Sequence, residues 1–259
     1  MAGLQLLSEY GLRVDGRRPN ELRQIRCKLG VFDQPDGSAY LEQGNTKVLA
    51  AVYGPHEIRG NKSKTLHDRA YVNCQYSMAV FSTAERKRRP RGDKKSQEMD
   101  MNLQQIFETA IRSELYPRSQ IDIYLEVLQA DGGNLSACVN AGTLALIDAG
   151  IPLKDYVCSC TSTLAPSQGG APPTPMVDVN HLEETLGGPG LSVSTMTRLD
   201  SVVHLELSGT RLHLSHIDPV ASKATTGCAD IQAILDKAVR GHVAQSLMAR
   251  EASGLGADT

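Results

Sequence analysis

The stretch Gln129-Ala130-Asp131-Gly132-Gly133-Asn134-Leu135-Ser136-Ala137 joins two segments of different hydrophobic period. Residues 120–129 alternate apolar and polar side chains, which predicts a β-strand, and the small-residue run 136–149 predicts a tightly packed helix. A helix N-terminus behind glycines presents free N–H groups and the positive end of the helix dipole, so the stretch is a candidate site for an anion such as phosphate. The alternative is a plain strand-to-helix connection that needs glycine conformations and uses Asn134 as the helix N-cap.

The segments before this stretch predict an antiparallel sheet. Asp36-Gly37 and Gly44-Asn45 are turn signals, and they separate strand-like runs at 21–33, 37–43 and 46–53. A fourth strand is predicted at 70–81. Apolar residues at helical spacing then predict a helix that ends before Tyr116-Pro117: Leu103, Ile106, Phe107, Ala110, Ile111 and Leu115.

A second unit is predicted to begin near Val157. It contains strand-like runs and then a long helical pattern, at 157–164, 176–179, 191–196, 202–207 and 228–248. The residues after Arg250 lack core side chains and are expected to fray. We therefore expect a mixed α/β chain with an N-terminal part (1–152), a C-terminal part (153–250) and a flexible tail (251–259).

Positive charge is concentrated in one segment. Seven basic residues stand there against Glu85 and Asp93, so this segment carries +5, while the whole chain carries −2 and the remainder therefore −7: Arg86, Lys87, Arg88, Arg89, Arg91, Lys94 and Lys95. One interpretation is a solvated surface loop, because charge runs usually face water. The other is an electrostatic contact to a polyanion.

Composition restricts the class of protein further. The chain has 259 residues, 41% of them hydrophobic, and no apolar run as long as the roughly 18 residues of a membrane span. Without a secretion signal, cytosol or nucleus is the default, and the six cysteines are expected to be buried reduced thiols. Neither these cysteines nor His213 and His216 have metal-ligand spacing, so no metal site and no cofactor are predicted.

Several separated motifs occur in an order that resembles the RNase PH family of phosphate-dependent 3′-to-5′ exoribonucleases, and within it the ring subunits of the RNA exosome. They are the double glycine, Asp15-Gly16-Arg17-Arg18, Gly44-Asn45-Thr46 and the segment from Phe81 to Lys87. The resemblance covers the chain from about Gly11 to Arg250. It implies an α/β RNase PH-like fold in which two βαβ-containing halves pack together.

The resemblance also implies which residues form the site. In active members the double glycine is followed by Thr or Ser and then by an arginine that holds the attacking phosphate; here Gly132 and Gly133 are followed by Asn134 and Leu135. In active relatives two aspartates six positions apart serve magnesium binding or proton transfer. In this chain the first of these positions holds Asp178 and the second holds Glu184. An acidic segment of this kind can instead cap a helix. In the family, the segment equivalent to 86–95 lines the ring's central opening and grips the RNA backbone, and Lys94 and Lys95 stand where active relatives carry arginines.

The function implied is that of a non-catalytic, RNA-binding exosome core subunit. It would pack beside paralogous RNase PH-type subunits, with cap subunits and a separate nuclease subunit, in the nucleus, nucleolus and cytoplasm. It would thread single-stranded RNA to that nuclease during rRNA maturation and RNA turnover. Neighbours are expected to cover strands at 46–53 and 121–128. The alternatives are an active phosphorolytic exoribonuclease that uses Lys94, Lys95 and the amides near Asn134, and an assembly protein without RNA contact.

Overall fold

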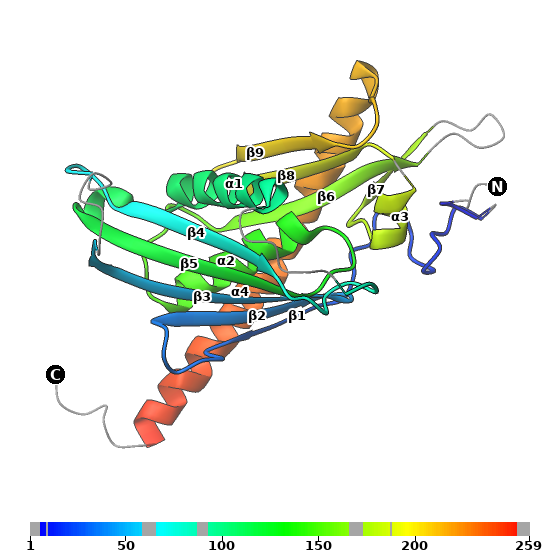
Figure 1. The fold of residues 1–259 in the computed structure, drawn as a ribbon. Coiled ribbons are helices and arrows are strands. Elements are labelled where there is room, and N and C mark those ends of the chain that lie inside the picture. Colours follow the sequence, from blue (N-terminus) through cyan, green and yellow to red (C-terminus); the bar gives the residue numbers. More distant parts are fainter. Residues whose placement is uncertain are drawn as a thin grey trace.

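The computed structural model describes residues 6–8, 10–58, 66–86, 93–165, 173–186 and 188–252, with side chains up to 249 in the last range. Two β-sheets enclose a central helix, and a long helix runs along the outside (Figure 1). The first part of the chain gives β1 (Ile25–Leu29), β2 (Gly37–Gln43), β3 (Thr46–Glu57), β4 (Tyr71–Met78), α1 (Lys94–Ala110), the 3₁₀ turn η2 (Ser113–Leu115), β5 (Ser119–Gln129) and α2 (Asn134–Asp148). The remainder gives β6 (Val157–Ala165), β7 (Thr174–Val177), α3 (His181–Thr185), β8 (Gly190–Met196), β9 (Ser201–Ser208), the 3₁₀ turn η3 (Leu214–His216) and α4 (Ile217–Ala252).

The first sheet has the strand order β1-β2-β3-β5-β4. The predicted antiparallel meander is present in β1, β2 and β3, while β4 runs parallel to β5 and is connected to it through α1. A parallel pair needs such a crossover. Both β3 and β5 lie inside the sheet with a hydrogen-bonded strand on each side. A neighbour therefore has no free edge of β3 or β5 to pair with, and the expectation that neighbours cover the strands at 46–53 and 121–128 stays a prediction.

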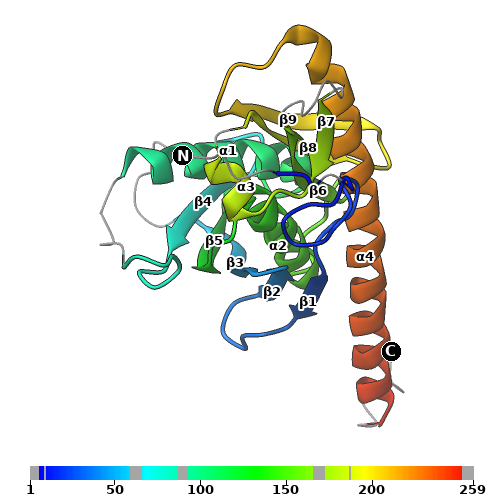
Figure 2. The same ribbon diagram turned by 90° about the vertical axis from the view of Figure 1, so that its right-hand side faces the viewer.

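The second sheet has the order β7-β6-β8-β9 and is antiparallel throughout. Helix α2 lies between the two sheets, against β2 and β3 on one side and β6 on the other, and α4 covers the opposite face of the second sheet (Figure 2). Strand β6 is buried on both faces for this reason. Close packing of α2 depends on small residues: a Cβ on Gly142 would lie 2.4 Å from Cζ of Phe107 in α1.

One hydrophobic cluster contains residues from both predicted parts, from Leu29 in β1 to Val239 in α4. The boundary at 152–153 falls between α2 and β6, and the division into two parts stays a prediction. The predicted start of the last helix at Cys228 is wrong, because α4 begins at Ile217 and passes through Gly227. This glycine does not end a helix. A Cβ there would lie 2.7 Å from Val177 and 2.9 Å from the sulfur of Cys160, so glycine permits close packing of α4 on β6.

Within the described ranges, no helix is both long and apolar enough to cross a membrane.

Candidate functional site

The double glycine brings two distant segments of the chain together. Gly132 and Gly133 have φ angles of +82° and +63°, in the left-handed region that favours glycine. A Cβ on Gly132 would lie 2.6 Å from the carbonyl carbon of Asn180 and 2.7 Å from the nitrogen of His181. The loop between β5 and α2 therefore presses directly on the backbone that leads into α3. The structure thus places the two sequence-predicted segments, 131–135 and 178–184, side by side.

Gly133, not Asn134, is the N-cap of α2, so the interpretation of Asn134 as the cap is wrong. The cap residue has a left-handed backbone, which glycine adopts without a steric cost. Asn134 is the first residue of the helix, and its buried Oδ1 has no hydrogen-bond partner among the described residues.

Leu135 is 6% exposed and belongs to the main hydrophobic cluster. Its side chain packs into the protein and offers no charge to the loop. Position 135, where the resemblance places an arginine in active family members, is therefore a core residue in this chain.

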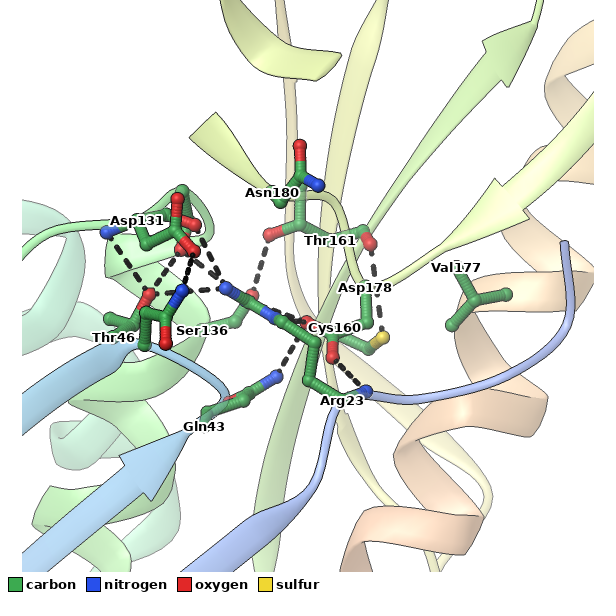
Figure 3. A network of polar contacts seen from close by, with 12 residues as sticks. Arg23, Gln43, Thr46, Asp131, Ser136, Cys160, Thr161, Val177, Asp178 and Asn180 are labelled. Carbon is green, nitrogen blue, oxygen red and sulfur yellow. Dashed lines mark hydrogen bonds and ion pairs between the residues drawn. The ribbon is translucent and has the colours of Figure 1, made fainter. Parts of the chain in front are cut away.

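Asp178 is buried at the end of β7 and binds residues from the N-terminal part of the chain (Figure 3). Its Oδ2 accepts from the backbone nitrogen of Arg23 at 2.7 Å. Its Oδ1 accepts from Nη2 and Nε of Arg23 at 2.8 and 3.1 Å and from Nε2 of Gln43 at 2.8 Å. Burial alone would raise the pKa of Asp178, but the charge and hydrogen bonds of Arg23, with a contribution from Arg17, hold this pKa below its ordinary value. Asp178 is thus an ionised carboxylate in which both oxygens accept hydrogen bonds.

Arg23 holds the double-glycine loop as well as Asp178. Its Nη1 donates to Oγ1 of Thr46 at 3.2 Å and to the carbonyl of Asp131 at 2.8 Å, and its Nη2 donates to the carbonyl of Gly132 at 3.3 Å. With the two bonds to Asp178, all five N–H donors of this guanidinium are engaged. The sequence reasoning did not single out Arg23. The only signal was a charged residue at the head of a strand-like run, and no periodicity shows that it is buried.

The acidic segment caps α3, as the second interpretation of it predicted. Oδ1 of Asn180 accepts from the nitrogen of Glu183 at 2.9 Å, and Oε2 of Glu183 accepts from the nitrogen of Asn180 at 3.0 Å. Glu183 is buried and also binds Arg13, whose Nε donates to it at 2.7 Å. Glu184, the predicted second carboxylate of the site, is exposed.

A cleft of about 460 Å³ opens beside this network. Arg17, from the Asp15-Gly16-Arg17-Arg18 motif, lies in its wall and donates to the carbonyl of Asp178 at 3.1 Å. The cleft is lined by Val14, Asp15, Arg17, Arg23, Gln24, Gly44, Asn45, Asp131, Asn180 and Leu182. Three of the motifs that define the resemblance therefore converge on one place in the fold.

The basic segment begins beside the same loop. The backbone nitrogen of Ala130 donates to the carbonyl of Ser82, four positions before Arg86, at 2.9 Å, which ties the approach to this segment to the end of β5. Arg86, Lys94 and Lys95 are exposed, and the two lysines are the first residues of α1. The other four predicted RNA contacts lie outside the described residues: Lys87, Arg88, Arg89 and Arg91.

All six cysteines are free thiols, and five of them are buried, as predicted. Burial raises the pKa of each thiol, so none is a ready thiolate at neutral pH. In the part of the chain that the structure describes, no three His, Cys, Asp or Glu side chains are placed to hold a metal ion.

Comparison with known proteins gives the family. The family model RNase PH, described as the 3′ exoribonuclease family, domain 1, matches residues 21–152. The exosome complex component RRP41 of Homo sapiens is 55% identical over 246 residues, which are 95% of this chain and 98% of that protein. The chain belongs to the RNase PH family.

Further known proteins are also similar to this chain. The exosome complex component ski6 of Schizosaccharomyces pombe is 42% identical over 93% of this chain and 96% of that protein. The exosome complex component Rrp41 of Pyrococcus horikoshii is 40% identical over 80% of each chain. The crystal structure of rice (Oryza sativa) Rrp46 superposes with a TM-score of 0.75 at 23% identity, over 88% of this chain and 100% of that one. These findings confirm the predicted family and the predicted α/β RNase PH-like fold.

Proposed function

We propose that the chain is a non-catalytic, RNA-binding subunit of an exosome core ring. Relatives that match nearly its whole length carry the name exosome complex component, which supports the assembly. The observation that carries the loss of catalysis is the set of bonds around Arg23 and Asp178. The buried guanidinium next to the double glycine already donates all five of its N–H groups within the protein.

A phosphorolytic site needs a cationic group that holds the attacking phosphate and an acid that protonates the leaving oxygen. Leu135 supplies no charge to this loop because it is a core residue. Asp178 is a poor proton donor because Arg23 keeps it ionised. Losing a charged hydrogen-bond pair to phosphate costs roughly 3 kcal/mol of transition-state stabilisation, on the order of a hundredfold in rate.

The retained role is contact with the RNA backbone through the basic segment 86–95. Arg86, Lys94 and Lys95 are exposed and positively charged, which suits reversible, sequence-independent binding to phosphates. In this proposal the chain packs beside paralogous RNase PH-type subunits and with cap subunits. It threads single-stranded RNA to a nuclease on another subunit, in rRNA maturation and RNA turnover in the nucleus, nucleolus and cytoplasm.

One observation favours a second function, an active phosphorolytic exoribonuclease. Lys94 and Lys95 are exposed at the N-terminus of α1, and Ser82, four positions before the basic segment, binds the backbone of Ala130 just before the double-glycine loop. Two lysines and the amides near Asn134 would then hold the phosphate without the bidentate fork of arginine.

Photocrosslinking of a uniform single-stranded RNA to the reconstituted ring, with mapping of the linked peptides, tests the RNA contact. We expect crosslinks within residues 86–95. A ring that assembles with this chain but forms no such crosslinks would identify it as an assembly protein. A chain that enters no ring with paralogous subunits would overturn the proposal altogether.

A further inference from the structure

Each sheet of the fold has two border strands, which are β1 and β4 in the first sheet and β7 and β9 in the second (Figure 1). The outer edge of a border strand presents backbone N–H and C=O groups that another extended chain can pair with. Proteins protect such edges with lysine or arginine, with proline, or with a segment that covers the edge. The four borders of this protein differ in this protection.

Both borders of the first sheet are protected. On β1 the side chains of Arg26 and Lys28 are exposed, and their charges oppose burial beneath an added strand. On β4 the backbone nitrogen of Tyr76 donates to Oδ1 of Asp100, so α1 occupies part of this edge. Neither border is a ready template for a further strand.

The β7 border of the second sheet is protected as well. This strand contains Pro175, which has no N–H to donate to a ladder. The backbone nitrogen of Val177 donates to the carbonyl of Pro19 at 2.9 Å, so the segment before β1 occupies part of the edge.

The β9 border has none of these three forms of protection. Its sequence, Ser201-Val-Val-His-Leu-Glu-Leu-Ser208, contains no proline, lysine or arginine. Within the described ranges no strand other than β8 pairs with it, and no other segment forms a hydrogen bond to its backbone. A register shift between Ser194 and Thr195 of β8 leaves residues 204–208 as the regular part of β9. The outer backbone groups of this part are therefore unpaired in the portion of the chain that the structure describes.

The side chains of residues 204–208 form one apolar and one polar face. Leu205 and Leu207 lie opposite Val193 and Leu191 of β8, which are buried beneath α4. Directly opposite residues of an antiparallel pair share a face, yet Leu205 is 51% and Leu207 46% exposed. Glu206 is on the other face, where its carboxylate accepts a hydrogen bond from α1 at 3.4 Å. The apolar layer beneath α4 thus continues onto the border strand and is only half covered there.

These features select an extended polypeptide as the partner. Only a strand has N–H and C=O groups spaced to match an unpaired edge, and a docked helix would leave the edge groups without partners. RNA does not fit, because β9 supplies no lysine or arginine and exposes two leucines beside a carboxylate. A strand with apolar side chains on the leucine face and polar ones on the Glu206 face meets both requirements.

A second copy of the chain does not meet them. Antiparallel pairing of residues 204–208 with the same residues of a copy would place Glu206 directly opposite Glu206. Parallel pairing in register would place the two carboxylates side by side as well. Like charges at neighbouring positions of this kind destabilise a sheet. The edge therefore favours a strand from a different protein.

We propose that the outer edge of β9, residues 204–208, pairs with a strand from another protein subunit of the same particle and so extends the second sheet. The inference rests on the proposed function, because it takes the partner from within the exosome assembly. It adds to that function a defined contact surface, a backbone edge with Leu205 and Leu207 on one face.

Amide hydrogen exchange on the full chain, alone and in the reconstituted particle, tests the pairing. In a strand paired on one side only, alternate N–H groups lack a partner. We expect fast exchange at alternate amides of residues 204–208 in the isolated chain and at least tenfold slower exchange at those amides in the particle. Equally fast exchange in the assembled particle would overturn the inference. Slowing that appears in the isolated chain as its concentration rises would also overturn it, because the partner would then be a second copy.

Variants at the two leucines test the apolar face. A photocrosslinking residue replaces Ser208, which is exposed at the end of the edge, and should link to another protein subunit in the particle. Leu205→Lys with Leu207→Lys introduces the kind of charge that protects β1 and should lower the crosslink yield at least tenfold. Leu205→Val with Leu207→Val keeps an apolar strand and should change the yield less than twofold. Because both leucines are about half exposed, we expect the isolated variants to unfold at nearly the wild-type temperature.

The outcomes separate this inference from the proposed function. A particle that assembles but crosslinks from position 208 only to RNA, or equally well in the lysine and valine variants, would overturn the strand addition alone. Failure of the unmodified chain to assemble would overturn the proposed function together with it. If the lysine variant does not fold, the exchange measurement on the unmodified chain decides.

Discussion

Arg23, just before β1, and Asp178, just after β7, bind each other across 155 positions of the sequence. The backbone nitrogen of Arg23 binds one carboxylate oxygen at 2.7 Å, and its guanidinium binds the other at 2.8 and 3.1 Å. The same guanidinium reaches the double-glycine loop through the carbonyls of Asp131 and Gly132. The pair therefore connects the segment before β1 with the double-glycine loop and with the segment that leads into α3.

Replacing Arg23 should destabilise the protein strongly. Arg23→Ala leaves the buried carboxylate of Asp178 without its main partner, which costs about 3–5 kcal/mol of unfolding free energy. The unfolding free energy of Arg23→Lys should lie between those of wild type and Arg23→Ala, because a lysine keeps the positive charge but loses the bidentate hydrogen bonding of the guanidinium. Urea unfolding measures both. Arg18→Ala is the control, since that side chain is 78% exposed. If Arg23→Ala lost as little unfolding free energy as this control, a structural role for Arg23 would be contradicted.

The depressed pKa of Asp178 makes stability depend on pH in a defined direction. Because the folded-state pKa lies below the ordinary value of 3.8, the unfolded chain binds the proton first as pH falls. The contribution of Asp178 is thus complete above the unfolded pKa and is lost as pH falls through the folded pKa. The difference in unfolding free energy between wild type and Asp178→Asn should be constant near pH 7, begin to shrink as pH falls below about 4, and shrink further through the folded-state pKa. A pH-independent difference would show that the charge of Asp178 is not what stabilises the fold.

Gly132→Ala should be more costly than Gly150→Ala. Both glycines have a positive φ, +82° and +70°, so both variants carry the backbone cost of about 1 kcal/mol. Only at Gly132 would the new Cβ also lie 2.6 Å from the backbone of Asn180, whereas nothing lies within 4 Å at Gly150. We expect Gly132→Ala to lose roughly 1–3 kcal/mol more unfolding free energy than Gly150→Ala, which is equivalent to several degrees in Tm. Equal melting temperatures would refute the close approach of the two segments.

The local elements of this fold could be predicted from sequence, whereas the contacts across the fold could not. The alternation at 120–129 and the small residues at 136–149 correctly predict β5 and α2, because pattern and turn residues act within a few positions. The pattern at 228–248 predicts only the later part of α4, which begins at Ile217 and passes through Gly227 where this helix packs closely on Val177 and Cys160. The partners of Asp178 are 135 and 155 positions away, and no pattern within a segment encodes them.

The basic segment should determine the RNA affinity of the assembled ring. Replacing Arg88, Arg89, Lys94 and Lys95 by Ala should lower the affinity to a similar degree for unrelated single strands. It should also flatten the salt dependence by about 0.7 in log–log slope for each lost contact. Two double variants that each remove two positive charges separate the effect of position from that of charge. Lys94→Ala with Lys95→Ala should lower the RNA affinity and flatten its salt dependence. Arg26→Ala with Lys28→Ala, two exposed positions on β1, should change neither. Unchanged affinity and slope in the quadruple variant would return the segment to a solvated surface loop.

Phosphate-dependent release of nucleoside diphosphates from the 3′ end of a single-stranded RNA is the measurement that tests the proposed loss of catalysis most directly. It is made on the assembled ring without the separate nuclease subunit, with and without inorganic phosphate. We predict a rate at background under both conditions, because Leu135 is a core residue and Arg23 has no free donor. Release that requires phosphate and disappears in Lys95→Ala or Glu184→Gln, two exposed positions whose change leaves the fold intact, would contradict it.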